Sequence, residues 1–252
     1  MKTDAFIIHL KRAHGRAPQV ARLKATLPMP ATVVDAVDGQ ALSEAQIAQV
    51  YRPGLHRPRY PFALRLSEIA CFLSHRKAWQ EIVVRELDAG LIVEDDVELG
   101  NGFSAVLDLA LSRLDRGEIV RFPKKARGER GKLVARAAAA CIVAPRPPRL
   151  GMQAQLVGRD AARALLAFTE RFDRPVDTSI QMQWLHGLPV LTAMPVAIRE
   201  VAGELGGTTV QGKSKPIPEI LARELHRARY RFAVRLYNVL NSPPEATASR
   251  EN

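Results

Sequence analysis

The segment LIVEDDVELG, residues 91–100, places three consecutive acids directly after an apolar stretch typical of a buried strand. These acids are Glu94, Asp95 and Asp96. Neighbouring carboxylates repel one another and resist removal from water, so packing alone gives little reason for this arrangement. Because open α/β sheets bind ligands beyond the carboxyl ends of their strands, the segment predicts a positively charged partner at the edge of such a sheet.

Apolar and amphipathic segments alternate on both sides of this motif. Strands are expected at residues 5–10, 31–39, 91–93, 118–122, 132–145, 152–158 and, as the last strand, 188–195. Helices are expected at residues 16–25, after a capping-box pattern at Ser43, at 68–87 with Ser67 as the cap, at 103–114, at 159–172 and after Asp177. This order predicts an α/β chain with a largely parallel sheet.

The composition, with 47% hydrophobic and 25% charged residues, is that of an ordinary globular protein. No apolar run reaches the roughly 18 residues of a spanning helix, and the first residues lack the apolar core of a secretion signal. We therefore expect a cytoplasmic protein. Its two cysteines, Cys71 and Cys141, are expected to be small buried residues. Cys71 and His75 have metal-ligand spacing on a helix, but no second Cys/His pair completes a zinc site.

The net charge of +11 implies attraction to an anionic partner such as nucleic acid, an acidic membrane or a phosphorylated substrate. The bases gather at residues 51–65 and 121–136, and each cluster could also be a solvated surface. A nucleic-acid-binding protein is one alternative. Aromatic residues make up only 6% of the chain, and no nucleic-acid-binding motif is present, which argues against it.

Three carboxylates at a strand end are suited to a hard divalent cation. Mg²⁺ or Mn²⁺ takes oxygen ligands, commonly one or two carboxylates together with substrate phosphates. The motif therefore predicts a cation that also holds a diphosphate. A solvated acidic turn is the alternative.

Several motifs in order resemble glycosyltransferase family 25, the bacterial lipopolysaccharide and lipooligosaccharide galactosyltransferases and their collagen-modifying relatives. The resemblance covers residues 4–200 and rests on VVDAVDGQAL (33–42), LSEIACFLSHRKAWQEIV (66–83), LIVEDDVELG (91–100), GMQAQLVGRDAARALL (151–166) and RPVDTSIQMQW (174–184). The chain departs from the family pattern at His9, Ala70, Gln155 and Gly158, where the family has asparagine, glycine, an aromatic residue and serine. These departures leave the donor sugar and the acceptor open.

The resemblance implies a GT-A type nucleotide-sugar-binding fold and an inverting glycosyltransferase. It implies transfer of a sugar, typically galactose, from a UDP-sugar to a cell-surface glycolipid such as lipopolysaccharide core. Carried over onto this chain, Asp96 is the ligand of Mn²⁺ or Mg²⁺, and Glu94 and Asp95 contact the donor. A non-catalytic homologue of the family is a further alternative.

Four other residues are candidates for the same site. An inverting reaction needs a general base, and the resemblance points to Asp177, with a helix-capping aspartate as the alternative. Glu68 and His75, seven residues apart, share one helix face and could line the donor cleft, while His75 could also be structural. Asp38, at the end of the second strand, could contact the nucleotide or be a turn residue.

The chain is expected to contain a catalytic domain at residues 1–200, a flexible loop at 201–218, a basic amphipathic helix at 219–241 and a disordered tail at 242–252. The bases of the helix are Arg223, Arg227, Arg229, Arg231 and Arg235, and its apolar stripe is Ile220, Leu221, Leu225, Phe232, Leu236 and Leu240. Such a helix is typical of peripheral binding to an anionic membrane, here the inner face of the inner membrane. The apolar stripe could instead pack on the catalytic domain or on a second subunit.

Overall fold

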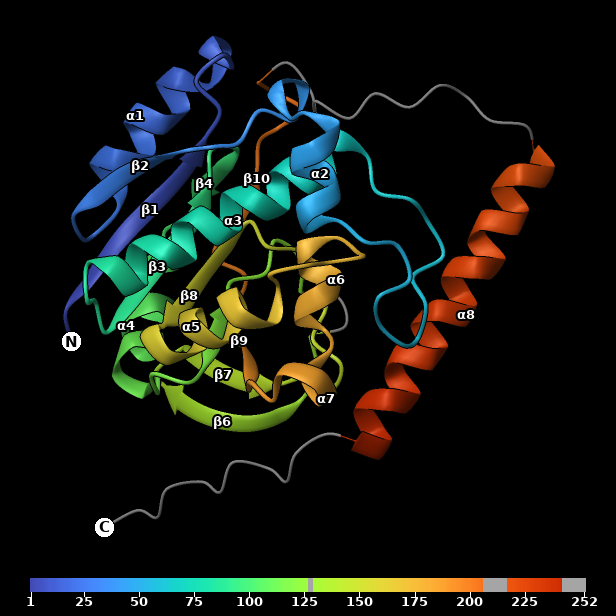
Figure 1. Cartoon of the computed structure of the whole chain (residues 1–252). Coiled ribbons are helices and arrows are strands. Elements are labelled where there is room, and N and C mark those ends of the chain that lie inside the picture. Colours follow the sequence, from blue (N-terminus) through green and yellow to red (C-terminus); the bar gives the residue numbers. More distant parts are fainter. Residues whose placement is uncertain (127–128, 206–216, 242–252) are drawn as a thin grey trace.

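The computed structural model describes residues 1–126, 129–205 and 217–241, and side chains of 217–221 are not described (Figure 1). Its central sheet consists of β1 (Thr3–His9), β2 (Ala31–Asp35), β3 (Ala89–Glu94), β5 (Ile119–Arg121), β6 (Lys132–Ala137), β7 (Ala140–Ala144), β8 (Ala154–Gly158) and β9 (Val190–Met194). The strand order is β2-β1-β3-β8-β5-β9-β7-β6. Strands β8 and β7 run opposite to the other six, because each is antiparallel to both of its neighbours. The expected α/β class is confirmed, with a mixed sheet in which most strands share one direction.

Helices cover both faces of this sheet and enclose two apolar cores. α1 (Ala17–Thr26) and α4 (Phe103–Arg113) lie on one face. α2 (Glu44–Val50), α3 (Leu66–Val84), α5 (Arg159–Phe168) and α6 (Val176–Ile180) lie on the other face. Strand residues alternate between the cores, so Ala5 and Ile7 face α1 and α4, while Phe6 and Ile8 face α3.

α3 lies directly over the central strands and carries part of the site. The helical spacing of its apolar residues predicts an inner face of Ile69, Phe72, Leu73, Trp79, Ile82 and Val83. This face is largely confirmed, since all but Leu73 and Val83 are buried. The predicted cap is wrong: the helix begins at Leu66 with Arg65 as its cap, so Ser67 lies within the first turn. Glu68 stabilises the N-terminus of the helix at this position, because its carboxylate accepts a hydrogen bond of 2.8 Å from the Arg65 backbone N–H.

A small second sheet extends the edge at which the acidic segment lies. β4 (Val97–Leu99) pairs antiparallel with β10 (Ile198–Glu200). The Val201 N–H also donates a 2.8 Å hydrogen bond to the Asp96 carbonyl. Residues 188–195 are therefore not the last strand, since β10 follows them and returns the chain to the acids.

α8 (Ile217–Asn241) runs along one side of the molecule, next to α7 (Gln183–His186) and the loop before α3 (Figure 1). Tyr230 and Val234 are buried, and Tyr237 contacts the Trp184 ring at 5.3 Å. Arg174, which is fully buried, donates a 2.7 Å hydrogen bond to the Tyr230 hydroxyl. One face of α8 is thus docked on the rest of the chain.

The predicted apolar stripe of α8 lies on its other face. Leu225, Phe232, Leu236 and Leu240 are all exposed, so these four side chains are not buried against the rest of the described chain. The side chains of Ile220 and Leu221 are not described. Most of the predicted loop (206–216) and the predicted tail (242–252) lie outside the described residues. No described helix is both long enough and apolar enough to span a bilayer.

Candidate active site

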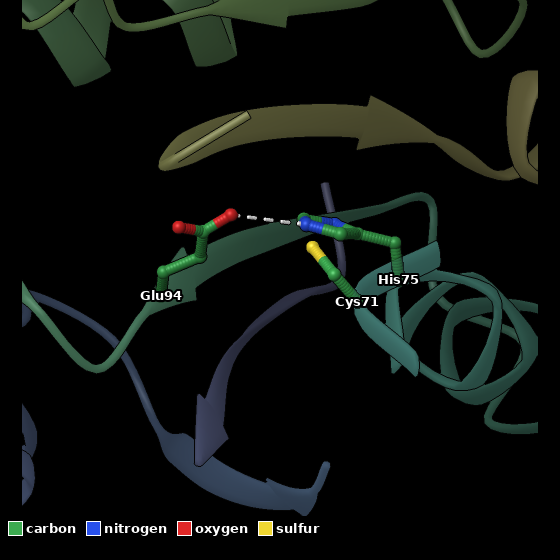
Figure 2. Close-up of side chains that lie close together, drawn as sticks. All are labelled: Cys71, His75 and Glu94. Atoms are coloured by element: carbon green, nitrogen blue, oxygen red, sulfur yellow. Dashed lines mark hydrogen bonds and ion pairs between the residues drawn. The ribbon is translucent and has the colours of Figure 1, made fainter. Parts of the chain in front are cut away.

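Glu94 is the last residue of β3, at the edge where the parallel strands β1, β2 and β3 end. Side chains alternate along β3, so Ile92 and Glu94 lie on the α3 side of the sheet. This places the Glu94 Oε1 atom 3.2 Å from the Nε2 atom of the fully buried His75 (Figure 2). The fold thus brings the acidic segment next to the helix of His75, while the roles of Glu94 and His75 in donor binding stay predictions.

Asp95 lies just beyond the strand and contacts the chain's own bases. Its Oδ2 atom lies 2.7 Å from His9 Nδ1, and its Oδ1 atom accepts a 2.5 Å hydrogen bond from Arg16. Both carboxylate oxygens are thus used by residues at the end of β1 and in the turn that follows it. Arg16 is thus the first positively charged partner of the acidic segment, and His9 contacts the same carboxylate. Neither contact was predicted from the sequence.

Asp96 is buried, but its charge is poorly compensated. Arg16 lies 3.6 Å from Oδ2, and Oδ1 has no hydrogen-bond partner among the residues that the structure describes. Burial raises the pKa of Asp96 to about 6, with Glu94, Asp95 and Glu200 adding to the rise and Arg16 opposing it. A buried carboxylate oxygen without a donor, among further acids, suits a hard divalent cation. The residues present therefore fit the expected metal.

Asp177 lies in the first turn of α6, whose N-cap is Pro175, so Asp177 is not the capping residue of this helix. Its Oδ2 atom accepts a 3.1 Å hydrogen bond from the Gly151 N–H, and Oδ1 accepts one of 3.2 Å from the Thr178 hydroxyl. Gly151 has a φ of +113°, a conformation that a side chain would strain. Burial raises the pKa of Asp177, although Gly151, Thr178 and Arg121 oppose the rise. The general-base role of Asp177 stays a prediction.

Arg121, at the end of β5, supports the Gly151 turn. The side chain is almost completely buried and donates to the carbonyls of Leu150 and Gly151 at 3.1 and 3.2 Å. Its guanidinium also lies 3.6 Å from the buried Glu129 carboxylate. Arg121 begins the basic cluster at residues 121–136, for which a solvated surface was one alternative, and its burial excludes that alternative for this residue. The burial of Arg121 could have been inferred from its position as the third residue of an otherwise apolar strand.

Cys71 is the second residue that sequence reasoning misplaced, because it is exposed rather than buried. Its Sγ, a His75 ring nitrogen and a Glu94 carboxylate oxygen all lie within 4.8 Å of one another (Figure 2). Desolvation and then the charges of Glu94, Asp177, Asp96 and Glu68 raise the pKa of the thiol well above its usual value, even though the residue keeps exposed surface. The charges of four predicted site acids thus act on Cys71, and His75 lies one turn further along α3.

Asp38 has different surroundings. Arg12 donates two hydrogen bonds to its carboxylate, at 2.6 and 3.0 Å, and the Gln40 N–H donates a third at 2.9 Å. These donors lower the pKa of Asp38. The residue lines an open pocket of about 430 Å³ at the ends of β1 and β2, together with Leu10, Lys11, Val37 and Lys77 among others. Its predicted contact with a nucleotide stays a prediction.

Comparisons with known proteins agree with these motifs. The model of glycosyltransferase family 25, described as lipopolysaccharide biosynthesis proteins, matches residues 2–132. Human procollagen galactosyltransferase 2 is 33% identical over 119 residues, which are 46% of this chain and 19% of that protein. The mouse inactive glycosyltransferase 25 family member 3 is 32% identical over 108 residues, 42% of this chain and 18% of that protein. The match thus spans about a fifth of the length of these relatives.

A weaker likeness exists among solved structures. Mannose-1-phosphate geranyltransferase from Thermus thermophilus covers 76% of this chain and 73% of its own, at 12% identity and a TM-score of 0.33. At that score the likeness supports no argument about function.

Proposed function

The chain belongs to glycosyltransferase family 25, and on that premise we propose that it transfers a sugar, galactose in the family pattern, from a UDP-sugar to a cell-surface glycolipid such as lipopolysaccharide core. The observation that carries this proposal is Asp96, a buried carboxylate at the carboxyl edge of β3 with one oxygen that no described residue satisfies. An oxygen of this kind is costly unless a cation or a donor completes it.

Asp96 and its neighbours would hold the donor. A bound Mn²⁺ or Mg²⁺ supplies charge stabilisation for a departing diphosphate. Asp96 would be its protein ligand, and Arg16 and His9 hold Asp95 in place beside it. Glu94, which keeps open surface, would contact ribose or sugar. The pocket beside Asp38 is large enough for part of a nucleoside and lies at the same sheet edge.

Asp177 is the proposed general base. In an inverting transfer the acceptor oxygen bonds to the anomeric carbon, the bond from that carbon to the diphosphate oxygen breaks, and the acceptor proton moves to the base. The raised pKa of Asp177 makes its carboxylate a better proton acceptor than an exposed aspartate. Arg121 and Gly151 would position Asp177, because the Gly151 carbonyl accepts a hydrogen bond from Arg121 and the Gly151 N–H donates one to Asp177.

α8 supports a second part of the proposal, peripheral binding to the anionic inner face of the inner membrane from the cytoplasm. Its exposed stripe of Leu225, Phe232 and Leu236 is flanked by the exposed Arg229 and Arg235. An outward apolar face bordered by arginines matches the chemistry of an anionic lipid surface, where a glycolipid acceptor would be found.

A panel of nucleotide sugars tests the function. The full chain should release UDP from one UDP-sugar only when Mn²⁺ or Mg²⁺ is present, and transfer should require a glycolipid or oligosaccharide acceptor. The resemblance to inactive family members makes a non-catalytic homologue the second candidate. Nucleotide-sugar binding without UDP release for any donor and acceptor would favour that candidate, and salt-sensitive DNA binding without nucleotide binding would contradict both.

A further inference from the structure

Cys71, His75 and Glu94 bring three different metal-ligating atoms together. Cys71 and His75 lie one turn apart on α3, and Glu94 reaches them from the end of β3 (Figure 2). The thiol sulfur, a His75 ring nitrogen and a Glu94 oxygen lie within 4.8 Å of one another, and it is the Nε2 atom that lies next to Glu94. Asp96, the expected ligand of a hard cation, is not part of this cluster.

The spacing is close to that of a tetrahedral site. With metal–nitrogen and metal–oxygen bonds of about 2.0–2.1 Å, two such ligands lie about 3.3 Å apart. The His75 Nε2 and Glu94 Oε1 atoms are already 3.2 Å apart. A sulfur bonded at about 2.3 Å would lie about 3.5 Å from either, so the Cys71 thiol has to move inward by no more than about 1.3 Å.

Gln155 provides the outer partner that a metal-binding histidine needs. Its amide nitrogen lies 3.2 Å from His75 Nδ1, and its amide oxygen is buried without a partner in the described part of the chain. A half-turn of this amide lets the oxygen accept a hydrogen bond from Nδ1–H. The lone pair of Nε2 is then directed at the cluster, as in sites where an outer amide or carboxylate fixes the histidine tautomer.

We propose that Cys71, His75 and Glu94 form a binding site for a thiophilic divalent cation of the zinc class, separate from the oxygen-ligand site at Asp96. Thiolate and imidazole are ligands that Zn²⁺ prefers over Mg²⁺. Cys71 is exposed, so a cation can enter and water can take the fourth position. The surrounding carboxylates of Glu68, Asp96 and Asp177 make the site attractive to a positive charge.

A cation bound at this site would compete with the nucleotide-sugar donor, because Glu94 cannot bind the cation and the donor at the same time. This consequence rests on the proposed function, whereas cation binding does not. Zn²⁺ would then raise the KM for the nucleotide sugar.

Cobalt spectroscopy on the full chain tests the site without requiring transfer. One equivalent of Co²⁺ added to the reduced, metal-free protein should produce a sulfur-to-cobalt charge-transfer band together with the visible bands of tetrahedral cobalt. Zn²⁺ should remove both. The sulfur band should be lost in Cys71→Ser and kept in the matched control Cys141→Ser, with folding of each checked by circular dichroism.

Two further variants separate this site from its neighbours. Asp96→Asn should keep the sulfur band, and Gln155→Leu should keep it while lowering Zn²⁺ affinity about 10- to 100-fold in a competition with a chelating indicator. No sulfur band in the wild type, a band that persists in Cys71→Ser, or a band lost in Cys141→Ser or Asp96→Asn would overturn the proposal. An unchanged Zn²⁺ affinity in Gln155→Leu would contradict the assignment of Gln155.

Discussion

At the scale of single residues, Asp96 is an acid in surroundings that favour its neutral form. Its pKa of about 6 in the folded protein lies above the ordinary value of 3.8, so the folded state holds this proton more tightly than the unfolded chain does. The resulting stability is fully present below about pH 4 and is lost as the pH rises through 6. A cation bound at Oδ1 would offset the free-energy cost of burying the charged carboxylate. A residue that binds a cation can therefore destabilise the protein when the cation is absent.

Asp96→Asn should therefore stabilise the metal-free protein at pH 7.5, by up to about 3 kcal/mol, the equivalent of two pKa units. At pH 4.5 the difference from the wild type should fall to about 1 kcal/mol, because most of the deprotonation of the folded state lies above that pH. Denaturant unfolding at both pH values in EDTA measures this, with the exposed Asp108→Asn as control. The same variant should lose transfer and the thermal shift caused by Mn²⁺. A variant that is less stable than the wild type at pH 7.5 would contradict this account of Asp96.

Asp177→Asn should bind the UDP-sugar normally but transfer about 10²–10⁴-fold more slowly. Asparagine retains an oxygen for the Gly151 N–H, so the turn should persist while the proton acceptor is lost. In the wild type the rate should fall at acidic pH as the Asp177 carboxylate becomes protonated, and this limb should be absent from the residual rate of the variant. Stopped assays across pH and donor titrations separate the two quantities. Weaker donor binding at an unchanged turnover would assign Asp177 to the donor side.

At the scale of elements, the contact of α3 with β1 and β3 determines where the site residues lie. α3 approaches β3 so closely at Gly90 that an added Cβ would lie 2.5 Å from Ile82 Cγ1 and 2.9 Å from Phe6 Cε2. This close contact brings Cys71 and His75 over the end of β3. A change in helix height would move the His75 ring away from Glu94.

Gly90→Ala should therefore cost about 1–3 kcal/mol of unfolding free energy, as for other overpacked cores. Gly102→Ala, at a glycine with open space around its Cβ position, should change stability by no more than about 0.5 kcal/mol. Urea unfolding compares the two. Equal unfolding free energies for the two variants would show that α3 can shift away from the sheet without destabilising the protein.

At the scale of the whole molecule, α8 has one face packed on the rest of the chain and another, apolar face directed outward. Tyr230, Val234 and Asn238 are buried, whereas Phe232 is 70% exposed. Removing the helix would leave the buried Arg174 without the Tyr230 hydroxyl, so truncation would mix stability with membrane binding. Substitutions on each face separate the two.

Phe232→Glu should weaken sedimentation with anionic vesicles at low salt by at least about tenfold, because it removes apolar area and adds repulsion. Its unfolding midpoint should stay close to that of the wild type. Tyr230→Phe should do the reverse, with lower stability and unchanged vesicle binding, since only the hydrogen bond to Arg174 is lost. Added salt should release the wild type. Vesicle binding that is insensitive to Phe232→Glu would exclude this face as the membrane surface.

The sequence by itself determined the local features: the α/β order, the acidic segment at a strand end, the inner face of α3 and the family. The first three follow from patterns within single segments, and the family follows from the order of several motifs along the chain. The direction of β8 and β7, the return of β10 to Asp96, the burial of Arg121 and the exposure of Cys71 were decided only by the tertiary structure. Each depends on which distant segment packs beside the residue, and an apolar run such as that around Cys71 reads alike whether its cysteine faces the core or an open edge of the sheet.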